Sequence, residues 1–388
     1  MLYIGVPYGS NFGWGVLGKE LVLAMSQLTD VRLLAPPGVP QAIDDEFDRF
    51  QIQKVMANSS RNWRQVGSAW RLDGPMIQAA YGRGLQEWVP QVAPPAHVGF
   101  AVFEEDRLDP AVISRASTHY RHLATGSTYC ANVLRNHGLT NVSVVYHGVD
   151  TAVFHPCQEP RSFMPERFIV FSGGKLELRK GQDIVIRAYK VLQDRHADVM
   201  LVNSWYYVWP HTRDTMAGSK LIRYYPPTTP DYFDWMNGLL AANGLDPERI
   251  VTIGLRDNRL LPRIYHCTDI GLFPNRVEGG TNMVLMEYMA CGKPVIASYN
   301  SGHLDVVRRE NALLIEKQMP MEMRTDNELP CTWHDSDLEE AIEKLEWCYH
   351  NRDELKRLGS QAAADMRDFP YRRVAEGLLT AVRQVDGA

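Results

Sequence analysis

The sequence lacks several features that would assign it to a class of protein at once. Its six cysteines include no C-x-x-C pair, which argues against a zinc knuckle or a redox-active dithiol. No apolar run approaches the roughly 20 residues that a membrane-spanning helix needs. Charge of one sign is not concentrated in any segment, and 41 Lys and Arg against 46 Asp and Glu give a net charge of -5. Because nucleic-acid binders usually present a basic face, we expect no nucleic-acid partner.

The start of the chain and one group of arginines lead to expectations about location. The chain enters an apolar strand at Leu2, so we expect no secretion signal and a cytoplasmic, reduced protein. Arg61, Arg64 and Arg71 form a small basic group, for which we favour a solvated helix face. Peripheral contact with the inner face of a membrane is the alternative interpretation of these three residues.

Two similar series of strands and helices follow one another along the 388 residues, which are too many for a single core. In residues 2–35, a strand, a Gly-rich loop, helical periodicity from Val16 to Leu28 and a second strand form a βαβ unit. A Pro-rich, aperiodic stretch at 155–166 resembles a linker, and the strand–loop–helix pattern restarts at 168–172. This order predicts an α/β fold with two doubly wound lobes, whose ligands bind beyond the carboxyl ends of the strands.

The first glycine-rich loop contains a dinucleotide-binding pattern that we interpret as misleading. Gly13, Gly15 and Gly18 match G-x-G-x-x-G, but six residues separate the strand from the first glycine. The next strand ends without the acidic residue that would bind a ribose. We therefore expect these glycines to serve a tight turn or to expose backbone amides to a phosphate, and we do not expect NAD.

Two segments of the second lobe carry the residue types that a nucleotide diphosphate requires. Lys175 and Lys180 border a loop after strand 168–172, where cations can neutralise a departing diphosphate; solvated loop lysines are the alternative. The second segment runs from Glu278 to Glu287. Gly280 lets the backbone approach a ligand closely, and Thr281 and Asn282 are candidate N-caps of the helix that follows. Glu287 is a carboxylate that can accept hydrogen bonds from ribose hydroxyls.

At these residues the sequence resembles the retaining glycosyltransferases of family four, which have the GT-B fold. The resemblance rests on SGGKLELRKG, on the stretch from Glu278 through GKPVIAS, on HGVDTAVFHP and on FEEDR. It implies two Rossmann-like lobes facing a cleft. It further implies an acceptor-binding lobe at 1–160 and a nucleotide-sugar-binding lobe at 161–370, with a last helix within 371–388 that crosses back to the first lobe.

The resemblance also assigns roles to single residues. Lys175 and Lys180 resemble the basic pair on the donor diphosphate, and the family more often has Arg at the first position. Glu278 resembles the glutamate that contacts the donor sugar, and Glu287 the one that holds the ribose. Eight residues separate these glutamates, one more than the family usually has.

Two first-lobe elements complete the implied site. Gly13 and Gly15 resemble the loop that closes over the diphosphate. Glu104 follows the strand predicted at Val98–Phe103, at the place where many family members carry a histidine. The resemblance therefore leaves open whether Glu104 takes over the role of that histidine.

The sequence thus predicts a metal-independent transferase that moves a hexose from a nucleotide diphosphate sugar to an acceptor hydroxyl with retention. A UDP-sugar is favoured and a GDP-sugar comes next, with glycan or polysaccharide assembly as the context and a glycan, lipid-linked or small-molecule acceptor. The single D-x-D, Asp335 to Asp337, precedes a helical run and predicts an N-cap and a first-turn acid rather than a metal site. A sugar-nucleotide epimerase of the same fold and a non-catalytic sugar-nucleotide-binding protein remain alternatives.

Overall fold

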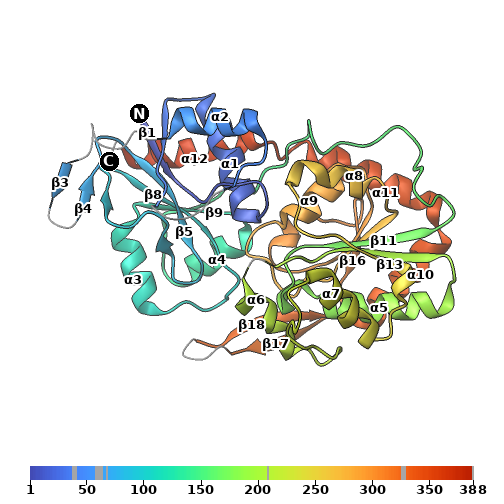
Figure 1. Ribbon diagram of the computed structural model, residues 1–388. Coiled ribbons are helices and arrows are strands. Elements are labelled where there is room, and N and C mark those ends of the chain that lie inside the picture. Colours follow the sequence, from blue (N-terminus) through green and yellow to red (C-terminus); the bar gives the residue numbers. More distant parts are fainter. Residues whose placement is uncertain (37–41, 57–63, 67–68, 208, 325–328, 387–388) are drawn as a thin grey trace.

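The computed structural model divides the chain between two α/β lobes (Figure 1), and it describes residues 1–36, 42–56, 64–66, 69–207, 209–324 and 329–386. The main sheet of the first lobe has the parallel order β10-β9-β8-β5-β1-β2, with the short β6 antiparallel to β5. Its strands are β1 (Leu2–Gly5), β2 (Val31–Leu33), β5 (Met76–Tyr81), β6 (Gln86–Glu87), β8 (His97–Val102), β9 (His122–Thr125) and β10 (Val142–Val144). The associated helices are α1 (Gly13–Ser26), α2 (Glu46–Val55), α3 (Pro110–His119) and α4 (Thr128–Asn136).

The second lobe repeats the scheme with the parallel order β13-β12-β11-β14-β15-β16. Its strands are β11 (Phe168–Gly173), β12 (Val199–Ser204), β13 (Ile250–Thr252), β14 (Ile270–Phe273), β15 (Val295–Ser298) and β16 (Leu313–Ile315). Its helices are α5 (Gln182–Arg195), α6 (Pro210–Arg213), α7 (Tyr232–Ala242), α8 (Leu261–Tyr265), α9 (Met283–Ala290), α10 (Leu338–His350) and α11 (Arg352–Met366). Five short 3-10 turns are η1 (Leu178–Lys180), η2 (Asp214–Gly218), η3 (Pro247–Arg249), η4 (Asn258–Leu260) and η5 (Ser301–Asp305).

Two small sheets lie outside this scheme. A three-stranded sheet in the first lobe consists of β3 (Arg64–Val66), β4 (Ala69–Arg71) and β7 (Val92–Ala93). An antiparallel hairpin in the second lobe pairs β17 (Gln318–Met323) with β18 (Cys331–Ser336). In Figure 1 this hairpin extends below the second lobe toward the first.

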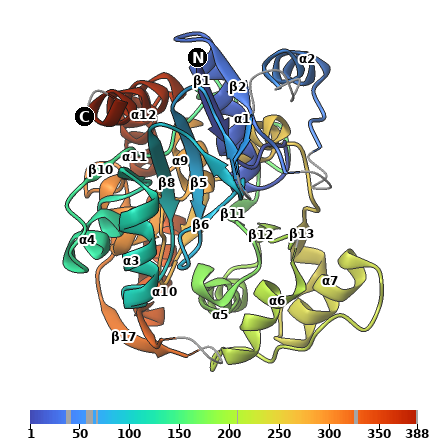
Figure 2. The same cartoon turned by 90° about the vertical axis from the view of Figure 1, so that its left-hand side faces the viewer.

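The last helix, α12 (Tyr371–Asp386), crosses back from the second lobe to the first and lies beside α1 (Figures 1 and 2). It buries Val374, Leu378 and Val382 in the same apolar cluster as Leu21 of α1 and Ile4 of β1. The last helix that the family resemblance implied within 371–388, crossing back to the first lobe, is confirmed. Within the described ranges, none of the helices combines the length and the hydropathy needed to span a bilayer.

The structure corrects the expected start of the first helix. The prediction placed Gly13 and Gly15 in a loop and began the helix at Val16, but α1 already begins at Gly13. A Cβ at Gly18 would lie 1.8 Å from the carbonyl oxygen of Pro7, so this glycine permits close packing of the helix on the preceding segment. Of the basic group, Arg61 lies outside the described residues, and Arg64 and Arg71 lie in β3 and β4, so the helix face considered for them is wrong.

Candidate active site

The loop between β11 and α5 brings three cations to the carboxyl end of the second-lobe sheet. It turns into α5 at Gly181, whose φ of 71° favours glycine. A Cβ at Gly181 would also lie 2.2 Å from the Pro274 carbonyl oxygen, so glycine permits the loop to pack against the end of β14. Lys175, Arg179 and Lys180 consequently stand beside the segment that follows β14.

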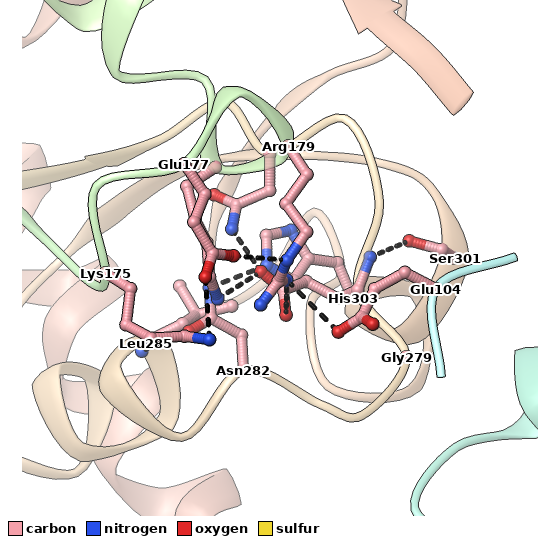
Figure 3. A network of polar contacts seen from close by, with 12 residues as sticks. Glu104, Lys175, Glu177, Arg179, Gly279, Asn282, Leu285, Ser301 and His303 are labelled. Atoms are coloured by element: carbon pink, nitrogen blue, oxygen red, sulfur yellow. Dashed lines mark hydrogen bonds and ion pairs between the residues drawn. The ribbon is translucent and has the colours of Figure 1, made fainter. Parts of the chain in front are cut away.

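These cations form one network with two buried glutamates (Figure 3). Lys180 Nζ lies 2.6 Å from Glu278 Oε1, and Arg179 Nη1 lies 3.3 Å from Glu278 Oε2. Arg179 Nε lies 2.6 Å from Glu177 Oε2, and Lys175 Nζ lies 2.7 Å from Glu177 Oε1. The structure therefore brings together Lys175, Lys180 and Glu278, as a shared site requires, and pairs each lysine with a carboxylate.

Arg179 connects this network to the first lobe. Its Nη1 lies 3.4 Å from Oε1 of Glu104, which follows β8. The sequence placed Glu104 at the site through the family resemblance, whereas Arg179 was overlooked. The signal for Arg179 was its position beside Lys180 in the segment LRKG, but only the fold shows that it faces the other lobe.

Burial and neighbouring charge act in opposite directions on the pKa values of the network. Burial raises the pKa of Glu278, but Lys180 and Arg179 outweigh this and hold it at about 2. Burial likewise raises the pKa of Glu177, and Arg179 and Lys175 bring it down to about 2. Burial lowers the pKa of Lys180, with Glu278 opposing. Both glutamates are therefore ionised at neutral pH, and their charge holds the cations in place.

The N-terminus of α9 adjoins this network. Asn282 is the N-cap, as the sequence suggested: its φ is 59°, and its side-chain oxygen accepts a hydrogen bond from the Leu285 N–H at 3.4 Å. Its amide nitrogen lies 3.0 Å from Nε2 of His303, and Thr281 is buried behind the turn, with Oγ1 2.9 Å from the Met286 sulfur. Burial lowers the pKa of His303 to about 4, so the imidazole beside the Asn282 amide is uncharged at neutral pH. The free amides of the first helical turn provide an anion site.

Gly279 and Gly280 permit contact between the lobes at this point. A Cβ at Gly279 would lie 2.2 Å from the Phe103 carbonyl oxygen, and one at Gly280 would lie 2.0 Å from Cε1 of His147. Ser127 Oγ donates a hydrogen bond to the Gly279 carbonyl oxygen at 2.5 Å. Gly280 was expected to let the backbone approach a ligand. In this structure the space that a Cβ at Gly280 would need is taken by His147 of the first lobe.

His147 is a residue at this junction that the sequence did not single out. Its side chain is 7% exposed, and neither ring nitrogen has a hydrogen-bond partner among the described residues. Burial lowers its pKa to about 4, against the opposing charge of Glu278. The segment HGVD before the linker shows where His147 lies along the chain, but it does not show which residues surround its side chain.

Glu287 lies apart from the ion network, in a small cavity where the two lobes and α12 meet. The cavity is also lined by Glu20, Asp150, Arg259 and Tyr371. The Glu287 carboxylate is buried and accepts hydrogen bonds from the Asn258 amide at 2.8 Å and the Tyr265 hydroxyl at 3.5 Å. Burial raises the pKa of Glu287 to about 8, so in this arrangement the carboxyl is largely protonated at neutral pH.

The start of α1 approaches the second lobe near Lys175. The Phe12 ring lies 6.1 Å from the Trp209 ring, and Lys175 Nζ lies 5.1 Å above the same indole. A Cβ at Gly15 would lie 2.9 Å from the Phe12 ring, whereas nothing lies within 4 Å of one at Gly13. The helix start that contains Gly13 and Gly15 is therefore near the loop between β11 and α5. Of these two glycines, only Gly15 is sterically restricted.

The D-x-D pattern has two separate structural roles. Asp337 is the N-cap of α10 and accepts a hydrogen bond from the Glu340 N–H at 2.8 Å, which confirms the capping part of the prediction. Asp335 lies in β18 and pairs with Arg276 at 2.8 Å, so it is not part of the helix start. Among the residues described, one group could hold a metal ion, and it joins α10 to the end of α5: His196, Glu346 and His350.

Comparisons with known proteins agree on the kind of domain. Residues 229–325 match the family described as "Glycosyl transferases group 1". The chain is 22% identical over 316 residues to spore coat protein SA of Bacillus subtilis, and this match covers 76% of the chain and 74% of that protein. It is 29% identical over 194 residues to D-inositol 3-phosphate glycosyltransferase of Salinispora tropica, but this match covers 47% of the chain and 37% of the relative.

Solved structures extend the likeness to the whole fold. HepE of Anabaena, crystallised with UDP and glucose, superposes with a TM-score of 0.67 at 13% identity and covers 99% of both chains. Such low identity supports a shared architecture of two lobes and a returning helix, and it carries no residue roles.

Proposed function

We propose that this chain, which belongs to the glycosyltransferases of the GT-B fold, moves a hexose from a nucleotide diphosphate sugar to an acceptor hydroxyl with retention of configuration. The observation that carries the proposal is the buried network in which Lys180 and Arg179 hold Glu278 beside the N-terminus of α9. Cationic groups and helix amides suit a diphosphate, and a carboxylate beside them suits sugar hydroxyls.

In this proposal the donor enters by exchanging partners within the network. The diphosphate contacts Lys175, Lys180 and the α9 amides, which replaces part of their interaction with the carboxylates. Glu278 then accepts hydrogen bonds from hydroxyls of the donor sugar, still oriented by Arg179 and by its own backbone N–H, which donates to Ser301 Oγ at 2.8 Å. The ribose hydroxyls likewise replace Asn258 and Tyr265 as hydrogen-bond donors to Glu287.

The transfer step breaks the bond between the anomeric carbon and the β-phosphate oxygen and forms a bond to the acceptor oxygen. The acceptor attacks from the face that the diphosphate leaves, which gives retention. The acceptor proton passes to an oxygen of the departing β-phosphate. Lys175 and Lys180 stabilise the charge that develops on the leaving group, so the step needs no metal ion.

Several finer features of the proposal concern the donor, the setting and the acceptor. We favour a UDP-sugar over a GDP-sugar and place the reaction in cytoplasmic glycan or polysaccharide assembly, with peripheral contact at the inner membrane face. The acceptor belongs to the first lobe, near Glu104.

The first test is calorimetry of the purified protein with UDP, GDP, ADP and NAD in the presence of a chelator. Binding of one nucleoside diphosphate is expected, and binding of NAD alone would contradict the proposal. A second assay measures release of the nucleoside diphosphate from the matching donor sugar. Release that increases with an acceptor supports a transferase, whereas isomerisation without an acceptor indicates an epimerase.

A further inference from the structure

The ends of two neighbouring first-lobe strands place an aromatic ring beside a pair of carboxyl groups. Tyr81 is the last residue of β5, and Glu104 and Glu105 follow β8, which pairs with β5. The Tyr81 side chain is 42% exposed, and its ring centroid lies 6.1 Å from that of Trp14. Burial raises the pKa of the Tyr81 hydroxyl, and the charges of Glu104 and Glu177 add to this effect. Tyr81 pairs in register with Val102, the last residue of β8, so it stands at the strand end that leads into Glu104 and Glu105.

The charges around this ring do not favour an anion. Burial and the adjacent Glu104 raise the pKa of Glu105 to about 7, because a second negative charge is unfavourable there. Arg179, the second-lobe cation that pairs with Glu104, is shared with Glu177 and Glu278. Arg83, whose charge acts on Glu105, donates a hydrogen bond to a second-lobe carbonyl at 3.0 Å. A phosphate placed here would meet unfavourable like charges.

An uncharged sugar fits the same groups. Its hydroxyls are donors for carboxylate oxygens, and the apolar face of its ring can stack on an exposed aromatic side chain. The acidic loop is also held in place from the second lobe, since the Thr332 N–H donates a hydrogen bond to Asp106 Oδ1 at 2.8 Å. The hairpin formed by β17 and β18 thus holds the acidic loop at Asp106, next to the carboxyl pair.

We propose that Tyr81, Glu104 and Glu105 form the acceptor subsite and that its acceptor is an uncharged saccharide rather than a phosphorylated one. The sugar ring stacks on Tyr81, and its hydroxyls donate to the two carboxyl groups. This inference rests on the proposed function, because it takes the transfer of a sugar as given and specifies the acceptor.

Matched acceptor pairs test the chemical class directly. With a saturating donor sugar, transfer is measured to a free hexose and to its 6-phosphate, and to a methyl disaccharide and its phosphorylated form. The uncharged member of each pair is expected to have a kcat/KM higher by about tenfold or more, as one unfavourable charge contact predicts. A phosphorylated member that reacts equally well or better would overturn the proposal.

Variants test the named residues. Tyr81→Ala is expected to raise the acceptor KM about tenfold without changing the donor KM, whereas Tyr81→Phe keeps the ring and stays within about twofold of the parent protein. Glu105→Lys is expected to shift the preference within each pair toward the phosphorylated member. Trp347→Ala removes a similarly exposed aromatic side chain, 39% exposed, from α10 and serves as the matched control. Unchanged acceptor KM in Tyr81→Ala would refute the subsite.

Donor binding and donor hydrolysis without acceptor are followed in parallel, so that the two proposals can fail separately. If no nucleoside diphosphate binds, the proposed function itself fails. If the donor binds and is hydrolysed but neither member of any pair accepts the sugar, the uncharged saccharide is wrong while the donor assignment stands.

Discussion

Replacing Lys180 with alanine separates the two roles that we assign to this side chain. In the structure, Lys180 Nζ lies 2.6 Å from Glu278 Oε1, and its side chain is 10% exposed. The substitution removes a charge partner of a buried carboxylate and, in the proposed reaction, a cation that stabilises the leaving diphosphate. Stability and turnover should therefore respond by different amounts.

The cost in stability follows from the environment of Glu278. Its pKa is held at about 2 instead of 4.5, which corresponds to about 3 kcal/mol of favourable interaction with the carboxylate form. Lys180 shares this effect with Arg179, and the Asn275 side chain also donates to the same carboxylate. Because Arg179 and Asn275 remain, we expect Lys180→Ala to lower the free energy of unfolding by about 1–2 kcal/mol, less than the full cost of breaking a buried ion pair. This contribution is complete above pH 4.5 and is lost as the pH falls toward 2.

The cost in turnover should be larger. Removing one group that stabilises transition-state charge typically lowers kcat by about 10²–10³-fold. The assay follows nucleoside diphosphate release at saturating donor, beside chemical denaturation of the same variant. Lys190→Ala is the control, because Lys190 lies on α5 with an exposed partner, Asp194, and should change stability by less than about 0.5 kcal/mol and leave turnover unaltered.

A specific result would refute this reasoning. If Lys180→Ala folds with the expected loss of stability and still turns over within about threefold of the parent protein, Lys180 is a structural partner of Glu278 only. The assignment of the leaving-group cation would then have to move to Lys175 or Arg179.

Three further predictions concern the lobe junction and the buried titratable groups. Gly279→Ala should disturb the contact between the lobes, because its Cβ would lie 2.2 Å from a backbone oxygen. We expect a lower melting temperature and a larger radius of gyration by X-ray scattering. An unchanged radius of gyration would contradict this prediction. His147 has a pKa lowered to about 4, so the native state loses stability as the pH falls from about 6.5 toward 4; His147→Gln should remove that part of the pH dependence in denaturant titrations. Glu287 has a pKa raised to about 8, so its effect has the opposite sign and stability falls as the pH rises from about 4.5 to 8; Glu287→Gln should flatten this decline, and an unchanged slope would show that the carboxyl ionises freely.

Local sequence patterns were sufficient for much of the second lobe. Strand 168–172 was predicted one residue short of β11, and the N-cap at Asn282 was among the two residues named. Short apolar runs ended by glycine or proline specify such strands without reference to the rest of the fold. The region from 40 to 95 gave no clear periodicity, and there the described part of the chain contains helix α2 and short strands of two to six residues.

The sequence could predict those site residues that are charged and directly follow the end of a predicted strand. Lys175, Lys180 and Glu278 follow the carboxyl ends of parallel strands, and such ends meet at one edge of the sheet. Arg179 could not be distinguished from a solvated loop residue, because its partner Glu104 lies in the other lobe. The same limit applies to His147, whose contact with Gly280 joins segments that are distant in the chain.

The sequence by itself determined the two βα series and the loop that carries Lys175 and Lys180, because each depends on periodicity or on residues a few positions apart. Only the tertiary structure decided which charges neutralise one another and which are buried. Ser127 meets Gly279 across 152 positions of sequence, and Arg179 meets Glu104 between lobes. Burial and through-space charge set the opposite pKa shifts of Glu278 and Glu287, two carboxylates that the sequence presents as a similar pair.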